Sequence, residues 1–260
     1  MFRLFGISLA DVGLRGAADL VQTALKLPGQ QLVVTANPEI LVYARRHPTY
    51  QKLLAGAGLV VPDGFGVILA SYLFREPLAR GRVTGVDLVE LLIAESGAKG
   101  YSLFFIGSAS NDILQKATLY FLKKYTKINI VGYEKGPIFS KNHSQFPMLD
   151  TDNDKLLASI REKKPDVILV GFGHPKQEEW LSYYLPQLPV KVGIGVGGAF
   201  DYFAGTLPRA PRFMSAIGFE WLWRLFMEPR RLKRILTAIL IFPVLALSDC
   251  IKGLFHVEQA

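Results

Sequence analysis

Polar or glycine-rich residues follow several apolar runs in this chain, and an α/β enzyme carries its chemistry at such places. Asp63 stands shortly after the run Leu59–Val61 and directly before Gly64. An Asp-Gly pair is ordinary turn chemistry, but a carboxylate that faces a cleft could take a proton from an attacking hydroxyl. Asp63 is therefore the candidate general base, with a structural turn as the equal alternative.

Two further segments offer polar side chains where predicted helices begin. Thr35 ends the apolar run Gln31–Thr35, and either Thr35 or Asn37 could cap the helix that begins at Pro38. Arg82 opens a short basic-polar stretch before another predicted helix. Capping explains these segments as well as function does, although the planar guanidinium of Arg82 could also bind phosphate.

The segment Gly171–Trp180 follows the clearest buried run, and its glycines would let a ligand approach the backbone. Glu178 and Glu179 lie in the first turn of the helix that Pro175 begins, where carboxylates already complement the helix dipole. We therefore expect nucleoside or sugar contact here instead of a phosphate cradle, and we rank His174 low as a catalytic base. The expected contacts are Gly171, Gly173, Pro175, Lys176 and Gln177.

The segment Gly193–Gly198 matches the dinucleotide pattern G-x-G-x-x-G, which is weak by itself. It lies near the end of the predicted α/β region, and the acid about 20 residues further on, Glu220, sits in an aromatic helix and not at a strand end. These glycines are therefore expected to admit a different nucleotide. The predicted contacts are Gly195, Gly197, Gly198 and the nearby Asp201.

No cluster of His, Cys and carboxylate residues has the spacing of a metal site, and no metal or other cofactor is expected. Asp150-Thr151-Asp152 is a D-x-D triplet, but helix capping and solvation explain it better. It also resembles the start of a calcium loop, yet Lys155 replaces the required glycine and Arg161 stands where the bidentate Glu belongs.

The C-terminal region concentrates the positive charge. Of a net charge of +8, seven basic residues against two acids between Leu207 and Arg234 supply +5. Arg224 and Arg231 are seven residues apart and share one face of a helix, with Arg234 nearby. Aromatic and apolar residues are interspersed at helical spacing: Phe213, Ile217, Trp221, Leu222, Leu225 and Phe226. This mixture favours an interfacial element on an anionic membrane over a buried helix, and the nearly neutral remainder disfavours a nucleic-acid partner.

The elements that must position these residues alternate between strands and helices, which predicts an α/β fold: a Rossmann-like, mostly parallel sheet with flanking helices. The predicted strands are 31–35, 59–61, 102–106, 128–131, 167–170 and 190–194. The predicted helices are 38–55, 67–74, 86–98, 113–124, 155–163 and 175–185, with a long irregular loop over 134–154.

The predicted organisation is an α/β catalytic domain, residues 1–205, followed by an arginine-rich amphipathic appendage with an apolar tail, residues 206–260. The longest apolar run, Ile235–Leu247, is interrupted by Pro243 and is shorter than the roughly 20 residues of a spanning helix. Cys250 is the single cysteine, and no signal peptide is recognised. We expect a cytoplasmic protein, peripheral on the inner face of the cell membrane, whose exposed apolar tail invites self-association into a homo-oligomer.

Together these segments resemble the WecG/TagA/CpsF glycosyltransferases, glycosyltransferase family 26. The resemblance rests on motifs that occur in family order across nearly the whole chain: TANPE at 35–39, DGFG at 63–66, RVTGVD at 82–87, GFGHPKQEEW at 171–180, GVGGAFDYFAG at 195–205, RAP at 209–211 and GFEWLWRLFMEPRRLKR at 218–234.

The resemblance implies an inverting, metal-independent enzyme that moves N-acetylmannosamine or a related hexose from a UDP-sugar to an undecaprenyl-diphosphate-linked sugar, in teichoic acid or surface polysaccharide synthesis. It implies Asp63 as the base, Thr35 and Asn37 as polar groups beside it, and Gln177 in the sugar pocket. It also implies that the appendage brings Arg224, Arg231 and Arg234 to the active site and contacts the membrane. Two alternatives stay open: a nicotinamide- or flavin-dependent oxidoreductase, and a non-catalytic membrane scaffold.

Overall fold

The computed structural model describes residues 1–107, 110–137, 139, 151–211, 214 and 218–257. Its centre is a six-stranded, fully parallel sheet with the strand order β4-β3-β8-β7-β5-β6. The strands are β3 (Gln31–Ala36), β4 (Leu59–Pro62), β5 (Leu103–Gly107), β6 (Ile130–Lys135), β7 (Val167–Gly171) and β8 (Val192–Gly195). The predicted parallel α/β fold is confirmed.

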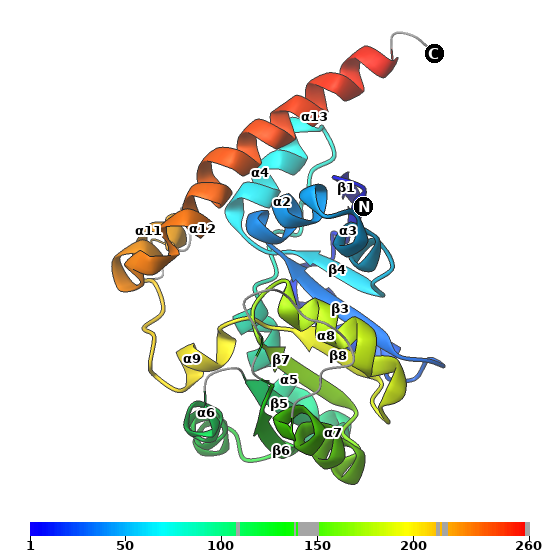
Figure 1. Cartoon of the computed structure of the whole chain (residues 1–260), viewed down its shortest axis with the longest axis vertical. Coiled ribbons are helices and arrows are strands. Elements are labelled where there is room, and N and C mark those ends of the chain that lie inside the picture. The colour runs from blue at the N-terminus through cyan, green and yellow to red at the C-terminus, as the bar shows by residue number, and fades with distance from the viewer. Residues whose placement is uncertain (108–109, 138, 140–150, 212–213, 215–217, 258–260) are drawn as a thin grey trace.

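Helices cover both faces of this sheet (Figure 1). One face packs against α1 (Gly13–Ala24), α5 (Gly85–Lys99), α6 (Asn111–Lys124) and α9 (Ala199–Phe203). The other face packs against α2 (Pro38–Arg46), α3 (Pro48–Ala55), α4 (Phe65–Leu73), α7 (Thr151–Lys163) and α8 (Lys176–Tyr184), with the short 3-10 turn η1 (Leu185–Gln187) after α8. Neighbouring strand residues alternate between the two cores, as Phe104 and Phe105 do, because successive side chains of a strand point to opposite faces.

An N-terminal hairpin was not predicted from the sequence. The antiparallel strands β1 (Phe2–Leu4) and β2 (Ile7–Leu9) join through Phe5 and Gly6, both with positive φ, at 50° and 78°. Positive φ at both central residues is the mark of a tight type I′ hairpin turn. Strands this short leave too little alternation for a pattern to show.

Two predicted boundaries are wrong. The single helix expected over 38–55 is two helices, α2 and α3, separated at His47, which has an extended conformation with φ −127° and ψ 93°. The ring of Pro48 disfavours a helical conformation at the preceding residue. The loop expected over 134–154 is shorter at both ends, because β6 extends to Lys135 and α7 begins at Thr151. The central part of that loop, including Asp150, lies outside the described residues.

The C-terminal region is helical from Glu220 onward. It contains α11 (Glu220–Met227), the 3-10 turn η2 (Pro229–Arg231), α12 (Leu232–Leu236), a π-helical turn η3 (Thr237–Ile241) and α13 (Phe242–Val257). The helical path from Pro229 to Lys252, 24 residues, is long and apolar enough to cross a membrane by length and composition. Phe213 and Ile217 of the predicted helical pattern lie outside the described residues. The division of the chain at residue 205 stays a prediction.

The interruption expected at Pro243 is therefore wrong. Proline lacks an N–H, and its ring clashes with the carbonyl group four residues earlier in a regular α-helix. The wider π-helical turn η3 directly precedes Pro243, and such a turn changes the hydrogen-bonding register locally. The helix continues through the proline at the cost of this irregular turn.

One face of α13 docks on the core while the opposite face is exposed. Phe242 is buried and meets Phe5 edge to face, and Asp249 forms an ion pair of 2.7 Å with Arg45 at the end of α2. In Figure 1, α13 runs beside α4 and α2 along one side of the molecule, far from α6. Large exposed apolar side chains recur at intervals of three or four residues along α12, η3 and α13: Leu232, Leu236, Leu240, Val244, Leu247 and Ile251.

Candidate active site

Asp63 lies at the carboxyl end of β4, where Gly64, with a φ of 94°, turns the chain toward α4. Its backbone N–H donates a hydrogen bond of 2.9 Å to the carbonyl of Ala36, and its carboxyl group accepts one from the backbone N–H of Gly85, the first residue of α5. The turn expected from the Asp-Gly pair is therefore present, and it holds a half-buried carboxyl group at a helix N-terminus.

The surroundings of Asp63 raise the pKa of its carboxyl group to about 7. Burial is the largest cause, and the nearby negative charge of Glu220 adds to it. Arg224, Arg82 and the Gly85 hydrogen bond oppose that shift. A carboxylate with a pKa close to neutrality can accept a proton during a reaction and release it afterwards.

Two arginines from different parts of the chain meet near Asp63. Arg82 forms an ion pair of 2.9 Å with Glu220 at the start of α11. Arg224, one turn further along α11, donates from Nε to the hydroxyl of Tyr202 at 2.7 Å and lies over the Tyr202 ring. The structure therefore brings Arg82 and Arg224, 142 residues apart in the sequence, to the same carboxyl group.

Arg234 on α12 lies against a second cluster. Its Nε donates to Oε2 of Glu39 at 2.6 Å, and its Nη2 is 3.0 Å from Nδ1 of His174. A guanidinium group only donates, so Nδ1 of His174 accepts and the imidazole is neutral. Burial, together with the charge of Arg234, lowers the pKa of His174 to about 4, which agrees with this arrangement and disfavours His174 as a base at neutral pH.

Arg231 completes the arginine set from the C-terminal region. Its Nε donates to Oε1 of Glu228 at 2.8 Å, and its charge lowers the pKa of Asp201, although burial raises that pKa more. Arg231 is therefore close to the loop that follows β8. The structure thus places Arg224, Arg231 and Arg234 along the carboxyl edge of the sheet, Arg231 and Arg234 paired with carboxylates and Arg224 with the Tyr202 hydroxyl.

Thr35 and Asn37 have local structural partners. The Thr35 hydroxyl donates to the carbonyl of Gly195 at 3.4 Å, which links the ends of β3 and β8. Asn37 is the N-cap of α2, and its Oδ1 accepts from the backbone N–H of Ile40 at 3.0 Å. The capping alternative is therefore realised for Asn37, whose side-chain amide can still donate.

The glycine-rich loops after β7 and β8 are joined by Gln177. Its Oε1 accepts from the backbone N–H groups of Gly173 at 3.1 Å and Gly197 at 2.9 Å. The space beside Gly195 is occupied by protein, because a Cβ atom there would lie 2.6 Å from Nε2 of Gln177. A nucleotide was expected to approach the backbone at Gly195, but in this structure the Gln177 side chain occupies that space. Gly193 lies inside β8 and not in a turn, so the pattern does not form a dinucleotide loop.

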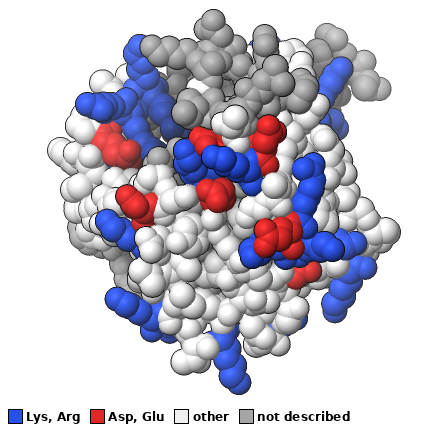
Figure 2. Space-filling view, turned by 60° about the horizontal axis from the view of Figure 1, so that its bottom comes forward, with Lys and Arg blue, Asp and Glu red and all other residues white. Residues whose placement is uncertain are grey.

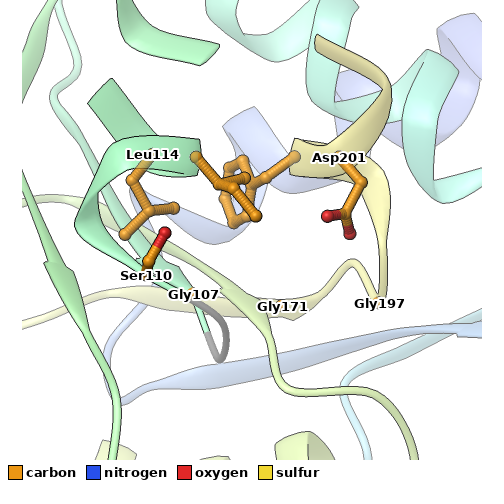
Figure 3. Close-up of a pocket in the computed structure, with 8 residues that line it drawn as sticks. Gly107, Ser110, Leu114, Gly171, Gly197 and Asp201 are labelled. Carbon is orange, nitrogen blue, oxygen red and sulfur yellow. The ribbon is translucent and has the colours of Figure 1, made fainter. Parts of the chain in front are cut away.

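A hollow opens between these loops and the start of α6 (Figure 3). It is small and partly open to solvent, and it is lined by Gly107, Ser110, Ile113, Leu114, Gly171, Gly197, Phe200 and Asp201. The Ser110 hydroxyl and the Asp201 carboxylate point into it from opposite sides, above strand ends that carry glycines (Figure 3). Of the predicted contacts, the hollow includes Gly171, Gly197 and Asp201.

Gly107 and Ser110 are lining residues that the sequence analysis missed. Gly107 ends β5 and Ser110 directly precedes α6, so a strand end with Gly and Ser before a helix was the available signal. Gly198 lies beside Asp201, and Lys176 lies over the ring of Phe139. Pro175 directly precedes α8.

Among the residues that the structure describes, no group of three His, Cys, Asp or Glu side chains could hold a metal ion. In the D-x-D triplet, Asp152 has a structural role, because it forms an ion pair of 2.7 Å with Lys135. On the face in Figure 2, basic side chains are scattered and several adjoin acidic ones.

The model of the glycosyl transferase WecG/TagA/CpsF family matches residues 2–254 of this chain. A Staphylococcus aureus protein named N-acetylglucosaminyldiphosphoundecaprenol N-acetyl-beta-D-mannosaminyltransferase is 34% identical over 203 residues, covering 78% of this chain and 74% of that protein. A Bacillus spizizenii protein of the same name is 35% identical over 206 residues, covering 79% and 74%.

Proposed function

Because this chain belongs to the WecG/TagA/CpsF family of glycosyl transferases, we propose that it transfers N-acetylmannosamine or a related hexose from a UDP-sugar to an undecaprenyl-diphosphate-linked acceptor sugar. The names of the two relatives, which specify both the sugar and the acceptor, support this assignment. The observation that carries it is the meeting of Asp63 with arginines from the core and from α11 at one edge of the sheet.

The hollow beside Asp201 is the proposed site of the uridine. A carboxylate can accept hydrogen bonds from ribose hydroxyl groups, and Asp201 points into the hollow opposite Ser110 (Figure 3). The diphosphate would then extend toward Arg231, which is close to Asp201.

Asp63 is the proposed general base. It would accept the proton of the acceptor hydroxyl as that oxygen bonds to the anomeric carbon of the donor sugar. The bond from the anomeric carbon to the phosphate oxygen breaks at the same time, and its electron pair leaves with UDP. One carboxylate suffices for such a direct displacement, which inverts the anomeric configuration. Thr35 and Asn37, at the end of the neighbouring strand β3, are proposed to orient the substrates.

The arginines are proposed to stabilise the departing UDP without a metal ion. Charge that develops on the phosphate in the transition state must be met by fixed positive charge or a cation. Arg224, Arg231 and Arg234 now have partners in Tyr202, Glu228 and Glu39, respectively. A diphosphate carries more charge than one carboxylate and accepts bidentate hydrogen bonds from guanidinium groups, so it would replace the two acidic partners.

We further propose that the protein lies on the inner face of the cell membrane, with α13 in the plane of the interface and not across it. The helix α4 packs against α13 and carries exposed apolar residues of its own, among them Leu69 and Tyr72, which we propose add to the lipid-facing surface. A spanning orientation would remove Phe242 from the core and separate Asp249 from Arg45. An interfacial helix keeps both contacts.

The two alternatives lose their support. Family membership identifies a glycosyltransferase, which sets aside the scaffold. The glycine pattern that suggested an oxidoreductase begins inside β8, where its first glycine cannot form the turn that a dinucleotide requires.

Product analysis tests the proposed chemistry. UDP-N-acetylmannosamine and a short-chain polyprenyl-diphosphate-N-acetylglucosamine acceptor are incubated with the protein, with and without EDTA. We expect a β-linked product by NMR at rates that EDTA leaves unchanged. An α-linked product contradicts direct inversion, and loss of activity with EDTA that Mg²⁺ restores contradicts metal independence.

A further inference from the structure

A buried polar network lies beneath the two glycine loops, and the proposed transfer steps do not use it. Glu178 on α8 is fully buried, and its Oε2 accepts a hydrogen bond of 2.9 Å from the hydroxyl of Tyr50 on α3. Its Oε1 accepts from Nε2 of Gln177 at 2.6 Å. Each oxygen of this carboxyl group therefore has a neutral donor. Burial raises the pKa of Glu178 to about 7.

The contacts of Gln177 allow one orientation of its amide group. Oε1 faces the two backbone N–H groups of Gly173 and Gly197, while Nε2 faces Glu178. Turning the amide around would set its NH₂ against two donors and its oxygen against a carboxyl oxygen. Glu178 thereby supplies the acceptor for Nε2 that, together with the two N–H groups, sets which end of Gln177 faces the loops.

The network has no spare room. A Cβ atom on Gly195 would lie 2.6 Å from Nε2 of Gln177 and 2.9 Å from Oε1 of Glu178. The hydrogen-bonded chain therefore runs from α3 through α8, past β8, to the backbone of both loops. Gly197 at its end lines the hollow, so the chain connects a buried carboxyl group to the wall of the proposed donor site.

We propose that Glu178, together with Tyr50, is a positioning residue for the donor site: it orients the Gln177 amide, which holds the loops at Gly173 and Gly197 in place. The identity of the ligand in this inference rests on the proposed function. Because the network shapes the site before any bond changes, it should affect the KM for the donor more than kcat.

Three variants separate this role from general stability. Glu178→Leu removes both acceptors at similar volume. Glu178→Gln keeps an oxygen for Nε2 of Gln177 and offers an NH₂ group to the Tyr50 hydroxyl, so it should restore the network without the charge. Asn153→Ala is the matched control. Asn153 on α7 accepts a buried hydrogen bond of 2.9 Å from Trp180, which lies on α8 as Glu178 does, and that bond does not lead to the loops.

Hydrogen–deuterium exchange over 171–177 and 195–199 measures how firmly the two loops are held. The KM and kcat for UDP-N-acetylmannosamine measure donor binding and turnover at the site. For Glu178→Leu we expect exchange and donor KM to rise about tenfold, with kcat within about twofold, since buried hydrogen bonds are lost. Glu178→Gln should match the unsubstituted protein, and Asn153→Ala should lower Tm only.

Unchanged exchange and KM in Glu178→Leu, or the same increases in Asn153→Ala, would overturn the inference. A failure of Glu178→Gln to restore the loops would also overturn it, because the charge would then matter and not the acceptor. The absence of any transfer by the unsubstituted protein would contradict the proposed function instead. The exchange measurement would still decide whether Glu178 holds the loops.

Discussion

The carboxyl edge of the sheet and the C-terminal region hold their polar side chains in different ways. At the sheet edge, Asp63, Thr35 and Gln177 hydrogen-bond to backbone groups of neighbouring strands, loops and helices. In the C-terminal region, Arg231 and Arg234 are held by carboxylates. Backbone partners persist when a ligand binds, whereas partly exposed ion pairs contribute little and exchange for stronger anions. We therefore expect the core to hold its side chains ready for catalysis, and the arginines of the C-terminal region to bind phosphate as proposed.

The largest expected effect on transfer activity comes from replacing Asp63 at the edge of the sheet. Asp63→Ala should lower transfer by about 10²- to 10⁴-fold, the usual contribution of a positioned base, while circular dichroism and Tm show an intact fold. Acceptor-dependent UDP release is the measurement. Asp87→Asn is the control, because Asp87 lies on the nearby α5 and pairs with Arg209. Near-normal turnover of Asp63→Ala would remove Asp63 as the base.

The arginines of the C-terminal region should affect the kinetics with the UDP-sugar donor. Replacing Arg231 and Arg234 together with Ala should lower kcat/KM for the UDP-sugar by about 10²-fold, as loss of transition-state charge stabilisation does. A soluble acceptor analogue separates this effect from membrane binding. Arg230→Ala, an exposed arginine in the same turn, is the control. Equal kinetics for both variants would leave these arginines no role beyond the lipid surface.

The pH dependence of kcat/KM reports on the ionisation of the Asp63 carboxyl group in the core. A base must be deprotonated to act, and the surroundings of Asp63 raise its pKa to about 7. The value of kcat/KM should therefore fall about tenfold per pH unit below about pH 7 and level off above it. Initial rates from about pH 5.5 to 8.5 measure this profile. A plateau that extends below pH 5 would mean that Asp63 keeps an ordinary carboxylate pKa or is not the base.

The smallest expected effect concerns the exposed apolar side chains along η3 and α13, to which Leu240 of η3 belongs. Leu240→Glu should weaken sedimentation with anionic vesicles about tenfold, because one exposed leucine no longer enters lipid, and kinetics with a soluble acceptor should stay unchanged. Leu122→Glu on the distant α6, which also replaces an exposed leucine, should bind vesicles normally. Equal binding of both variants would contradict a lipid-facing α13.

The strand ends could be predicted from the sequence because local patterns determine them. Asp63, Thr35 and the glycine loops each follow an apolar run, and a parallel sheet brings the carboxyl ends of its strands to one edge. The motif resemblance added the roles of the arginines. Both sources depend on residues close together in the chain.

Long-range contacts could not be predicted in the same way. The ion pairs of Arg82 with Glu220 and of Arg234 with Glu39 join residues 138 and 195 positions apart, and no local pattern encodes such partners. The tolerance of Pro243 depends on a π-helical turn, which has no sequence signature of its own. The buried position of Glu178 likewise depends on Tyr50 from another helix.

Acceptor-dependent UDP release from UDP-N-acetylmannosamine is the decisive test of whether this chain transfers a sugar from a UDP-sugar to a lipid-linked acceptor. The protein is assayed with EDTA, a short-chain polyprenyl-diphosphate-N-acetylglucosamine acceptor and lipid, beside a panel of other UDP-sugars. We expect UDP release that requires the acceptor and is fastest with one N-acetylhexosamine donor. Well-folded protein that releases no UDP from any donor, with lipid and acceptor present, would contradict it.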